Sequence, residues 1–194
     1  MDQLIDYISK RTHFSLAAKD YTRSISKLKS FKKGDVLIKD GQNVDKTFFV
    51  VGGCLRAYVF DNNGKEHTLQ FAVKDHWISD YIAIFNNEKS NQVIECVSDS
   101  SVIELSLNDG IDNICSRFPE IESLHRKNLE RHIVSLQKRL LNQLQLSSTE
   151  RYDLFQSQYP EIDKYALNYH IASYLGITQQ SLSRIRAEKV KKQN

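Results

Sequence analysis

The pattern of apolar and polar positions divides the chain into stretches of different character. Residues 1–30 place apolar side chains at near-helical spacing, which predicts a short helical lead-in. In residues 31–107, short runs of β-branched and aromatic residues alternate with the turn-forming pairs Gly-Asp, Asp-Gly, Gly-Gly and Asn-Gly. This pattern is typical of β-strands joined by turns. Residues 118–146 have an early Pro119, which suits a first helical turn, and then neither glycine nor proline. This last stretch predicts one long helix.

In the β-rich stretch, turn signals recur at short, regular intervals, as they do in a sandwich, barrel or jelly roll. Its clearest hairpin starts with the strand 55–60 and turns at Asn63-Gly64, because an Asn-Gly pair readily takes the positive φ of a tight turn. A jelly roll encloses a pocket, so a small ligand inside it is plausible. The expected strands are 36–38, 48–51, 55–60, 68–71, 93–97 and 101–107.

The predicted long helix carries a narrow apolar stripe on an otherwise polar surface. Its apolar members are three or four residues apart, which favours a coiled-coil seam with a second copy of the helix. Packing of the same stripe against the β-domain of its own chain is the alternative. The stripe consists of Leu129, Ile133, Leu136, Leu140 and Leu144.

A further helix is expected from Ser147. The run Ser147-Ser-Thr-Glu150 fits a capping box, and Tyr159-Pro160 ends the helix. We therefore expect an α+β protein with three parts. They are a jelly-roll sensor domain with its helical lead-in (1–117), a dimerisation helix (118–146) and a helical C-terminal domain (147–194).

The strongest local signal lies between residues 171 and 186, where the sequence predicts two helices joined by a tight turn. Gly176 can take the left-handed conformation that ends the first helix, and Thr178 suits the N-cap of the second. Ala172 is small where the two helices must cross. The positions expected to face inward are Ile171, Leu175, Leu182 and Ile185, with Ile177 in the corner. This is the spacing of a helix-turn-helix.

The polar face of the second of these helices fits the major groove of DNA. Glutamine bonds adenine and arginine bonds guanine, while hydroxyls and first-turn N–H groups hold phosphates. An ordinary helical hairpin with a polar outer face is the alternative. The residues expected to bind DNA are Thr178, Gln179, Gln180, Ser181, Ser183, Arg184 and Arg186.

Charge and composition agree with this interpretation. Residues 1–118 carry 15 basic and 16 acidic side chains, whereas residues 119–194 carry 12 and 8, so the basic excess lies beside the predicted DNA-binding helix. The chain has no apolar run long enough for a membrane span and no signal-peptide core. Its three cysteines are far apart, which fits a reducing compartment. We therefore expect a cytoplasmic protein.

A β-rich domain, one long helix and a C-terminal helix-turn-helix together resemble the Crp/Fnr family of bacterial transcription regulators. The resemblance implies a cyclic-nucleotide-binding-like jelly roll, dimerisation through the long helix and a two-fold symmetric operator. It also places Gln179, Gln180 and Arg184 at the base-reading positions. The stretches that carry it most specifically are 31–37, 53–58, 63–66 and 171–186.

The stretch that matches the phosphate-binding cassette of this family departs from its pattern. Ser79 and Asp80 stand where the family has Gly-Glu, and Lys89 and Ser90 stand where it has Arg-Ser or Arg-Thr. Aspartate is one methylene shorter than glutamate, and lysine lacks the planar two-point contact of arginine with phosphate. Cyclic AMP is therefore not the expected effector. These four residues remain the expected effector pocket, and no cofactor is assigned.

The sequence leaves two other functions open. One is a sensor that acts through protein–protein contacts and binds DNA weakly and without sequence preference. The other is a haem or metal sensor that uses His125 or His132 on the long helix. No catalytic motif is present, so we expect a non-enzyme. The expected partners are double-stranded DNA, a second copy of the chain and a small-molecule effector, with RNA polymerase as a further candidate and no membrane.

Overall fold

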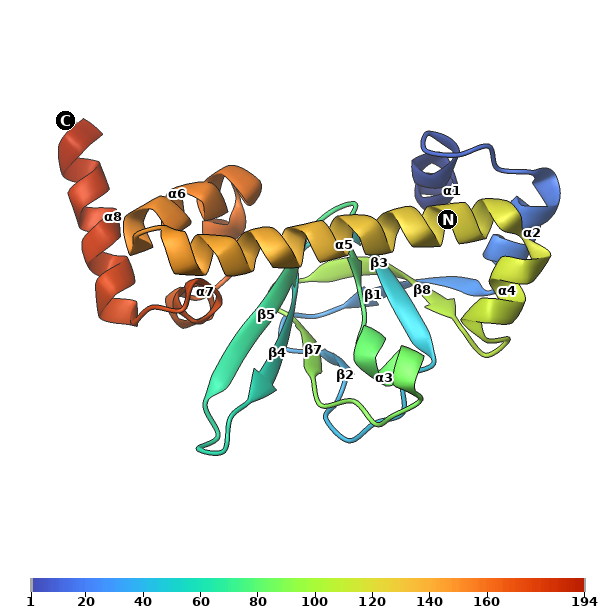
Figure 1. Ribbon diagram of the computed structural model, residues 1–194, viewed down its shortest axis with the longest axis horizontal. Coiled ribbons are helices and arrows are strands. Elements are labelled where there is room, and N and C mark those ends of the chain that lie inside the picture. Colours follow the sequence, from blue (N-terminus) through green and yellow to red (C-terminus); the bar gives the residue numbers. More distant parts are fainter. Residues whose placement is uncertain (1, 194) are drawn as a thin grey trace.

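The computed structural model describes residues 2–193, and Figure 1 shows how their helices and strands are arranged. The strands are β1 (Ser26–Phe31), β2 (Val36–Ile38), β3 (Lys46–Gly52), β4 (Leu55–Phe60), β5 (Glu66–Ala72), β6 (Trp77–Ile78), β7 (Val93–Cys96) and β8 (Ser100–Ser106). The helices are α1 (Asp2–Ser9), α2 (Leu16–Ser24), α3 (Tyr81–Asn86), α4 (Ile111–Arg117), α5 (Pro119–Gln145), α6 (Ser148–Gln158), the 3₁₀ turn η1 (Ile162–Lys164), α7 (Asn168–Leu175) and α8 (Gln179–Gln193).

The strands form two antiparallel four-stranded sheets, in the orders β1-β8-β3-β6 and β2-β7-β4-β5. A core of aliphatic and aromatic side chains fills the space between them, and it includes Ile38, Phe48, Leu55 and Ile94. Burial does not alternate in the central strands: β3 and β4 each bury four consecutive residues, because helices cover the outer faces of these strands. The predicted α+β class and the β-roll are confirmed.

One local prediction for the lead-in is wrong, and the predicted hairpin of β4 and β5 is confirmed. Residues Ser26–Phe31 form the edge strand β1, paired with β8, instead of continuing the helical lead-in. The strand alternates lysine with small or apolar residues, and charged lysines are typical of exposed edge strands. In the β4–β5 hairpin only Gly64 takes a positive φ (76°), and Asp61 accepts hydrogen bonds from the backbone of Asn63 and Lys65, so the turn is longer than a two-residue one.

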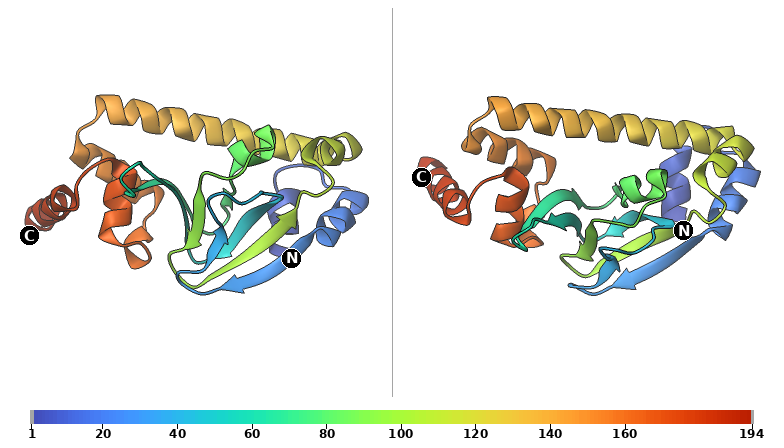
Figure 2. Two further views of the ribbon diagram at one scale, coloured as in Figure 1. Left: turned by 90° about the horizontal axis from the view of Figure 1, so that it is seen from below. Right: turned by 60° about the horizontal axis from the view of Figure 1, so that its bottom comes forward.

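Helix α5 crosses the molecule from the α1, α2 and α4 group to the C-terminal helices, above the β-roll (Figures 1 and 2). Its 27 residues give it a length of about 40 Å. It ends at Leu146, and the predicted capping box between Ser147 and Glu150 begins α6. No helix within residues 2–193 is long and apolar enough to cross a membrane.

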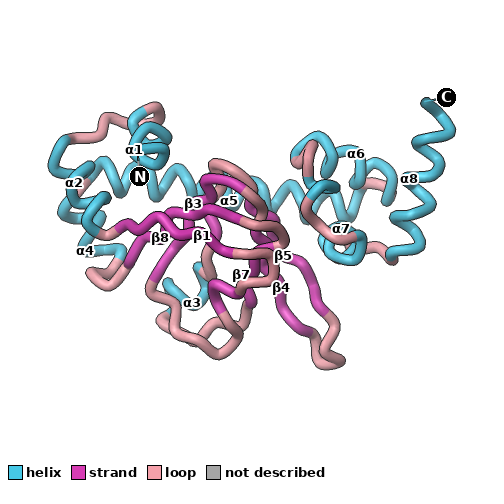
Figure 3. Tube along the Cα trace, turned by 180° about the vertical axis from the view of Figure 1, so that it is seen from behind, coloured by secondary structure: helices cyan, strands magenta, loops and turns pink. Residues whose placement is uncertain are grey.

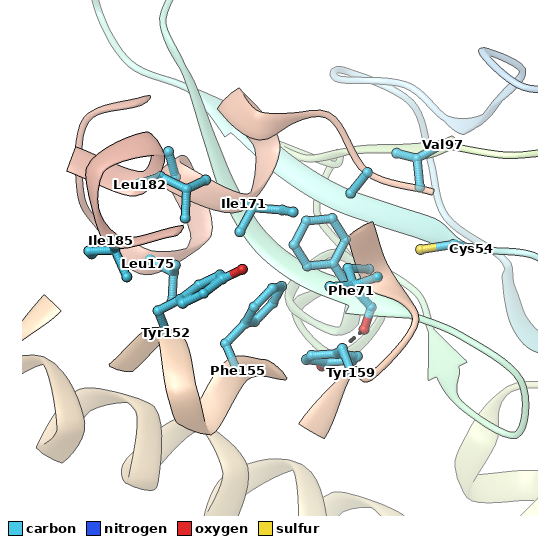
Figure 4. Close-up of a cluster of buried hydrophobic side chains, with 13 residues drawn as sticks. Cys54, Phe71, Val97, Tyr152, Phe155, Tyr159, Ile171, Leu175, Leu182 and Ile185 are labelled. Carbon is cyan, nitrogen blue, oxygen red and sulfur yellow. Dashed lines mark hydrogen bonds between the residues drawn. The ribbon is translucent and has the colours of Figure 1, made fainter. Parts of the chain in front are cut away.

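The C-terminal helices pack directly against the β-roll, as the view from behind in Figure 3 shows. Figure 4 shows the core that joins them: Phe71 of the roll lies among Tyr152, Phe155 and Ile171 of α6 and α7, and Cys54 lies at the far side of the same cluster. All five side chains are almost fully buried. The hydrophobic core is therefore continuous between the roll and the helix-turn-helix.

Candidate nucleic-acid interface and effector region

The helix-turn-helix is formed by α7 and α8, with the geometry that the sequence predicts. Gly176 has a φ of 68° and a ψ of 36°, and its N–H donates to carbonyls of the last turn of α7. The Thr178 hydroxyl accepts from the backbone N–H of Ser181 at 3.1 Å and caps α8. The inward positions Ile171, Leu175, Leu182 and Ile185 are all at least 96% buried. The turn therefore has a fixed shape, held by its own core.

The outer face of α8 begins with a polar, solvent-exposed surface. Gln179, Gln180, Ser183 and Arg184 are exposed, and Arg184 makes no ion pair with any residue between 2 and 193. Ser181 is partly buried beneath the cap. The first turn of the helix also leaves N–H groups directed outward, as every helix N-terminus does. This surface, which we call the α8 outer face, has the chemistry that reads base edges and holds phosphates.

Arg186, which the sequence analysis assigned to DNA, has a different environment. Its Nε donates to the Tyr152 hydroxyl at 3.0 Å, and its other nitrogens contact Asn168 and Asp163. Three of its contacts therefore tie α8 to α6, α7 and η1. Because its hydrogen-bonding capacity is used inside the domain, we assign it to the positioning of α8 and not to base reading.

The predicted seam on α5 is open to solvent along its C-terminal half. Leu129 is partly buried near the roll, but Ile133, Leu136, Leu140 and Leu144 are 48–76% exposed. The neighbouring Val134 and Leu141 are exposed as well. The β-domain of the same chain therefore leaves most of the stripe from Ile133 onward uncovered. Four large apolar side chains in a row on one helix are typical of a surface that another helix covers.

Two of the four residues expected to hold an effector, Asp80 and Ser90, form a buried polar network with Gln92 and α3 instead. Asp80 is fully buried, and its carboxylate accepts hydrogen bonds from Ser90 (2.7 Å), the Gln92 amide (3.1 Å) and the first N–H groups of α3. Ser79 donates to a carbonyl of β3 at 2.7 Å, and Lys89 is exposed. The acceptor sites of the Asp80 carboxylate are therefore occupied by the chain itself. We assign this network to holding α3 in place, and no longer to an effector.

The sequence analysis missed a polar contact between the roll and α7. The Ser173 hydroxyl accepts from the backbone N–H of Thr68 at 2.8 Å and donates to the Glu66 carbonyl at 3.0 Å, so it joins α7 to the edge of β5. Beside it, the buried Arg56 of β4 lies over the rings of Tyr58 and Tyr169, and Tyr169 belongs to α7. An arginine between two rings is favoured by cation–π attraction. The helix-turn-helix is thus fixed to the β-roll by hydrogen bonds as well as by the shared core.

His170 lies in the same interface and is 4% exposed, with neither ring nitrogen hydrogen-bonded. Burial, followed by the charges of Arg56 and Lys33, lowers the pKa of His170 from 6.5 to about 3. The unfolded chain therefore binds a proton at this imidazole below pH 6.5, whereas the folded chain does not. The stability of the folded protein is therefore unaffected by this imidazole above pH 6.5, its pKa in the unfolded chain, and decreases as the pH falls below that value.

Acidification should for this reason weaken the folded protein. Between pH 7 and pH 5 we expect His170 to account for a loss of roughly 2 kcal/mol in the free energy of unfolding. Urea unfolding at the two pH values measures it, and His170→Leu is the matched variant because leucine does not titrate. An equal loss in the variant and the unmodified protein would assign the pH dependence to other groups.

No group of three or more histidine, cysteine or carboxylate side chains gathers in the described part of the chain. His125 and His132 are seven residues apart on one face of α5, and they lie beside the aromatic rings of Phe85 and Tyr81. Burial lowers the pKa of both imidazoles.

The comparisons with known proteins agree with the fold. The model of the cyclic nucleotide-binding domain family matches residues 28–117. FixK2 from Bradyrhizobium japonicum has a TM-score of 0.72 at 14% identity, over 87% of this chain and 86% of that one. The c-di-GMP-responsive global regulator CLP from Xanthomonas campestris has a TM-score of 0.69 at 12% identity, over 92% and 93% of the two chains. No curated protein sequence matches at a significant level.

A third solved structure, a proposed regulator of the Crp/Fnr family from Eubacterium rectale, has a TM-score of 0.72 at 16% identity, over 92% of this chain and 85% of that one. The protein is therefore built from a cyclic-nucleotide-binding-type β-roll, a long helix and a helix-turn-helix. This is the Crp/Fnr architecture, and the resemblance indicated by the sequence is confirmed at the level of the fold.

Proposed function

We propose that this protein is a homodimeric transcription regulator that binds a two-fold symmetric DNA operator. The observation that carries the proposal is the helix-turn-helix with its exposed outer face on α8. Gly176 and Thr178 set the turn, and the buried positions of α7 and α8 hold the recognition helix rigidly. A rigid helix with glutamine and arginine at its exposed N-terminal end fits the major groove.

Dimerisation through α5 is the reason to expect a two-fold symmetric operator. Two copies related by a two-fold axis present two α8 helices, and these read half-sites about one helical turn of DNA, roughly 34 Å, apart. An effector that favours one arrangement of the two helices would raise or lower the affinity for DNA. RNA polymerase is a further partner of such a regulator.

Selection from a pool of random duplexes, with purified full-length protein and no added ligand, tests the proposal. We expect enrichment of an inverted repeat with half-sites about one turn apart. If nothing is enriched, the selection is repeated with an extract of small molecules from cells. A protein that still shows no preference over random DNA at near-physiological salt is not a sequence-specific regulator.

Replacement of Arg184 by alanine should weaken binding to the enriched sequence by about 1–3 kcal/mol and relax the preference at one base pair. The reason is that the exposed guanidinium has no partner inside the described chain and lies on the α8 outer face. Lys191→Ala is the matched control, since it removes the same charge from the same helix two turns farther on. It should weaken binding to the enriched sequence and to random DNA alike. The ratio of these two affinities therefore distinguishes Arg184→Ala from Lys191→Ala.

Unchanged specificity in the Arg184→Ala variant would remove this residue from the base-reading set. The assay is a fluorescence-anisotropy titration of the enriched duplex and of a scrambled one, at a single stated salt concentration, because phosphate contacts make every affinity salt-dependent.

A further inference from the structure

A groove of about 600 Å³ lies between α5 and α6 and is bounded by α7. Figure 1 shows α6 beside the C-terminal end of α5. Every residue that lines the groove belongs to one of these three helices, so neither a strand of the β-roll nor the recognition helix α8 takes part. Small-molecule sites in proteins have volumes of about 300–1,000 Å³ and often lie where domains meet. This surface, which we call the α5–α6 groove, has that size and joins the long helix to the C-terminal domain.

The floor of the α5–α6 groove is apolar. Phe155 and Leu175 are buried there, whereas Val134 of α5 and Leu154 of α6 line the groove and are 49% and 46% exposed. Two half-exposed apolar side chains on neighbouring helices are covered incompletely by the chain itself. An apolar group placed between them would remove their surface from water, which is favourable.

The same groove is strongly cationic. Its one acidic side chain, Glu130, pairs at 2.5 Å with Arg126, which lies outside the lining. Four basic side chains line the groove, and none of them forms an ion pair with a carboxylate in residues 2–193. They are Arg131, Lys138, Arg139 and Arg151. The groove therefore has an excess of positive charge that the described chain does not neutralise.

Three of these cations have unused capacity for an anion. Arg151 donates to the Leu146 carbonyl at 2.7 Å and to the Ser148 hydroxyl, which are uncharged acceptors, and its Nε is buried without a hydrogen-bond partner. A buried donor without an acceptor is unfavourable. Arg131 and Lys138 are exposed, and their side chains make no hydrogen bond within the described chain.

The fourth cation, Arg139, is already used by the fold. It donates to the Leu69 carbonyl of β5 and lies over the ring of Tyr174 of α7, so it holds α5 against both elements. Arg139 and Tyr174 therefore separate the groove from the β-roll.

The groove and the dimer seam lie on opposite faces of α5. None of the five seam residues lines the groove. At 3.6 residues per turn, the α5 positions of the lining are centred roughly 170° around the helix axis from the seam, and only Glu130 and Gln143, at the two edges, come near it. The α5 positions of the lining are Glu130, Arg131, Val134, Ser135, Lys138, Arg139, Asn142 and Gln143. A second copy on the seam therefore leaves the centre of the groove open.

We propose that the α5–α6 groove binds a small amphipathic anion, an apolar carboxylate whose acid group is held by the unpaired cations and whose apolar body lies on Val134 and Leu154. The charge of the lining fits the acid group, and the half-exposed floor fits the apolar body. The DNA backbone fits less well, because it has no apolar body and α8 contributes nothing to the lining. Binding is independent of DNA. Only its effect on DNA affinity rests on the proposed function, since a ligand between α5 and α6 would bias how the helix-turn-helix sits on the long helix.

Displacement of a fluorescent probe tests the ligand class. Full-length protein without DNA is titrated with 8-anilinonaphthalene-1-sulfonate, which has an apolar ring system and one negative charge. Octanoate and octanol then compete with the probe at pH 7, because they share an apolar chain and differ in the charged group. We expect saturable binding of the probe, and displacement by octanoate at a concentration at least about fivefold lower than by octanol.

Variants of the groove test the location. Lys138→Gln removes one unpaired cation, so it should weaken octanoate about fivefold, leave octanol unchanged and abolish the preference. Lys127→Gln is the matched control, since it removes the same charge from the same helix, one turn before Arg131 and outside the lining. It should keep the preference. Leu154→Ser reduces the apolar floor and should weaken both competitors alike. Lys138 and Leu154 are exposed, so both variants should fold, which circular dichroism monitors.

Four results would overturn the proposal. They are the absence of saturable probe binding, equal displacement by octanoate and octanol in the unmodified protein, an unchanged preference in Lys138→Gln, and displacement by inorganic phosphate as effective as by octanoate. A fifth concerns DNA: if Lys138→Gln weakens binding to a random duplex as much as Lys191→Ala does, the groove cations contact DNA instead. The first four results are obtained without DNA, so failure of the groove and failure of the regulator function are distinguishable.

Discussion

Leu140→Asp should convert the protein from a dimer to a monomer and abolish tight binding to the inverted repeat. Leu140 is 62% exposed in the single chain, in the middle of the apolar stripe on α5. In a two-fold interface the substitution occurs twice, and each copy removes roughly 1.5–3 kcal/mol of leucine burial and buries a carboxylate. A loss of at least about 4 kcal/mol raises the dissociation constant of the dimer roughly a thousandfold.

Sedimentation velocity gives the mass of each species, and anisotropy gives the affinity for the full repeat and for a single half-site. The variant should bind both DNAs with the weak affinity of one helix-turn-helix. Leu16→Asp is the matched control: Leu16 is 72% exposed, but it lies on α2. A monomeric Leu16→Asp variant, or a Leu140→Asp variant that remains a dimer, would place the interface elsewhere. Thermal unfolding of the Leu140→Asp monomer should be little changed, since the leucine is exposed.

The features that could be predicted from the sequence are those whose cause is local. The αL turn at Gly176, the cap at Thr178 and the capping box at Ser147 each need only a few neighbouring residues, and all three are present in the structure. The long helix was predictable because its apolar stripe repeats over four turns. The β-roll followed from the regular spacing of turn signals, and the predicted hairpin at Gly64 is present.

The features that could not be predicted depend on contacts between distant parts of the chain. Strand β1 has no strong β-propensity and forms because β8 pairs with it. Asp80 looks like a ligand-binding carboxylate in the sequence, and only the fold shows that Ser90 and Gln92 occupy it. Arg186 looks like a DNA contact until Tyr152 and Asp163 are placed beside it.

Arg56 is the clearest example of such a non-local feature, and it has the largest expected effect on stability. In the sequence it lies in the predicted strand 55–60, where nothing indicates that its charged group is buried. In the structure its side chain is 1% exposed, and its guanidinium contacts Glu66 at 2.6 Å and Glu95 at 2.8 Å. Two carboxylates and two aromatic rings therefore surround one buried cation.

Arg56→Ala should lower the free energy of unfolding by about 3–5 kcal/mol, because it leaves two partly buried carboxylates facing each other without a cation. The same substitution removes the cation from the ring of Tyr169, so it should also loosen α7 from the roll. Urea unfolding followed by circular dichroism measures the first effect, and hydrogen exchange of the α7 backbone measures the second.

Lys29→Ala is the matched control for Arg56→Ala, since Lys29 pairs with Glu104 on the edge of the other sheet but is 41% exposed. A surface pair of this kind contributes at most about 1 kcal/mol. Equal losses in the two variants would mean that Arg56 is no more than a surface ion pair. A large loss in Arg56→Ala alone, together with faster exchange in α7, would instead show that one buried cation holds the sensor domain and the recognition helices in a fixed relation. Through that relation, a change in the roll would reach the DNA.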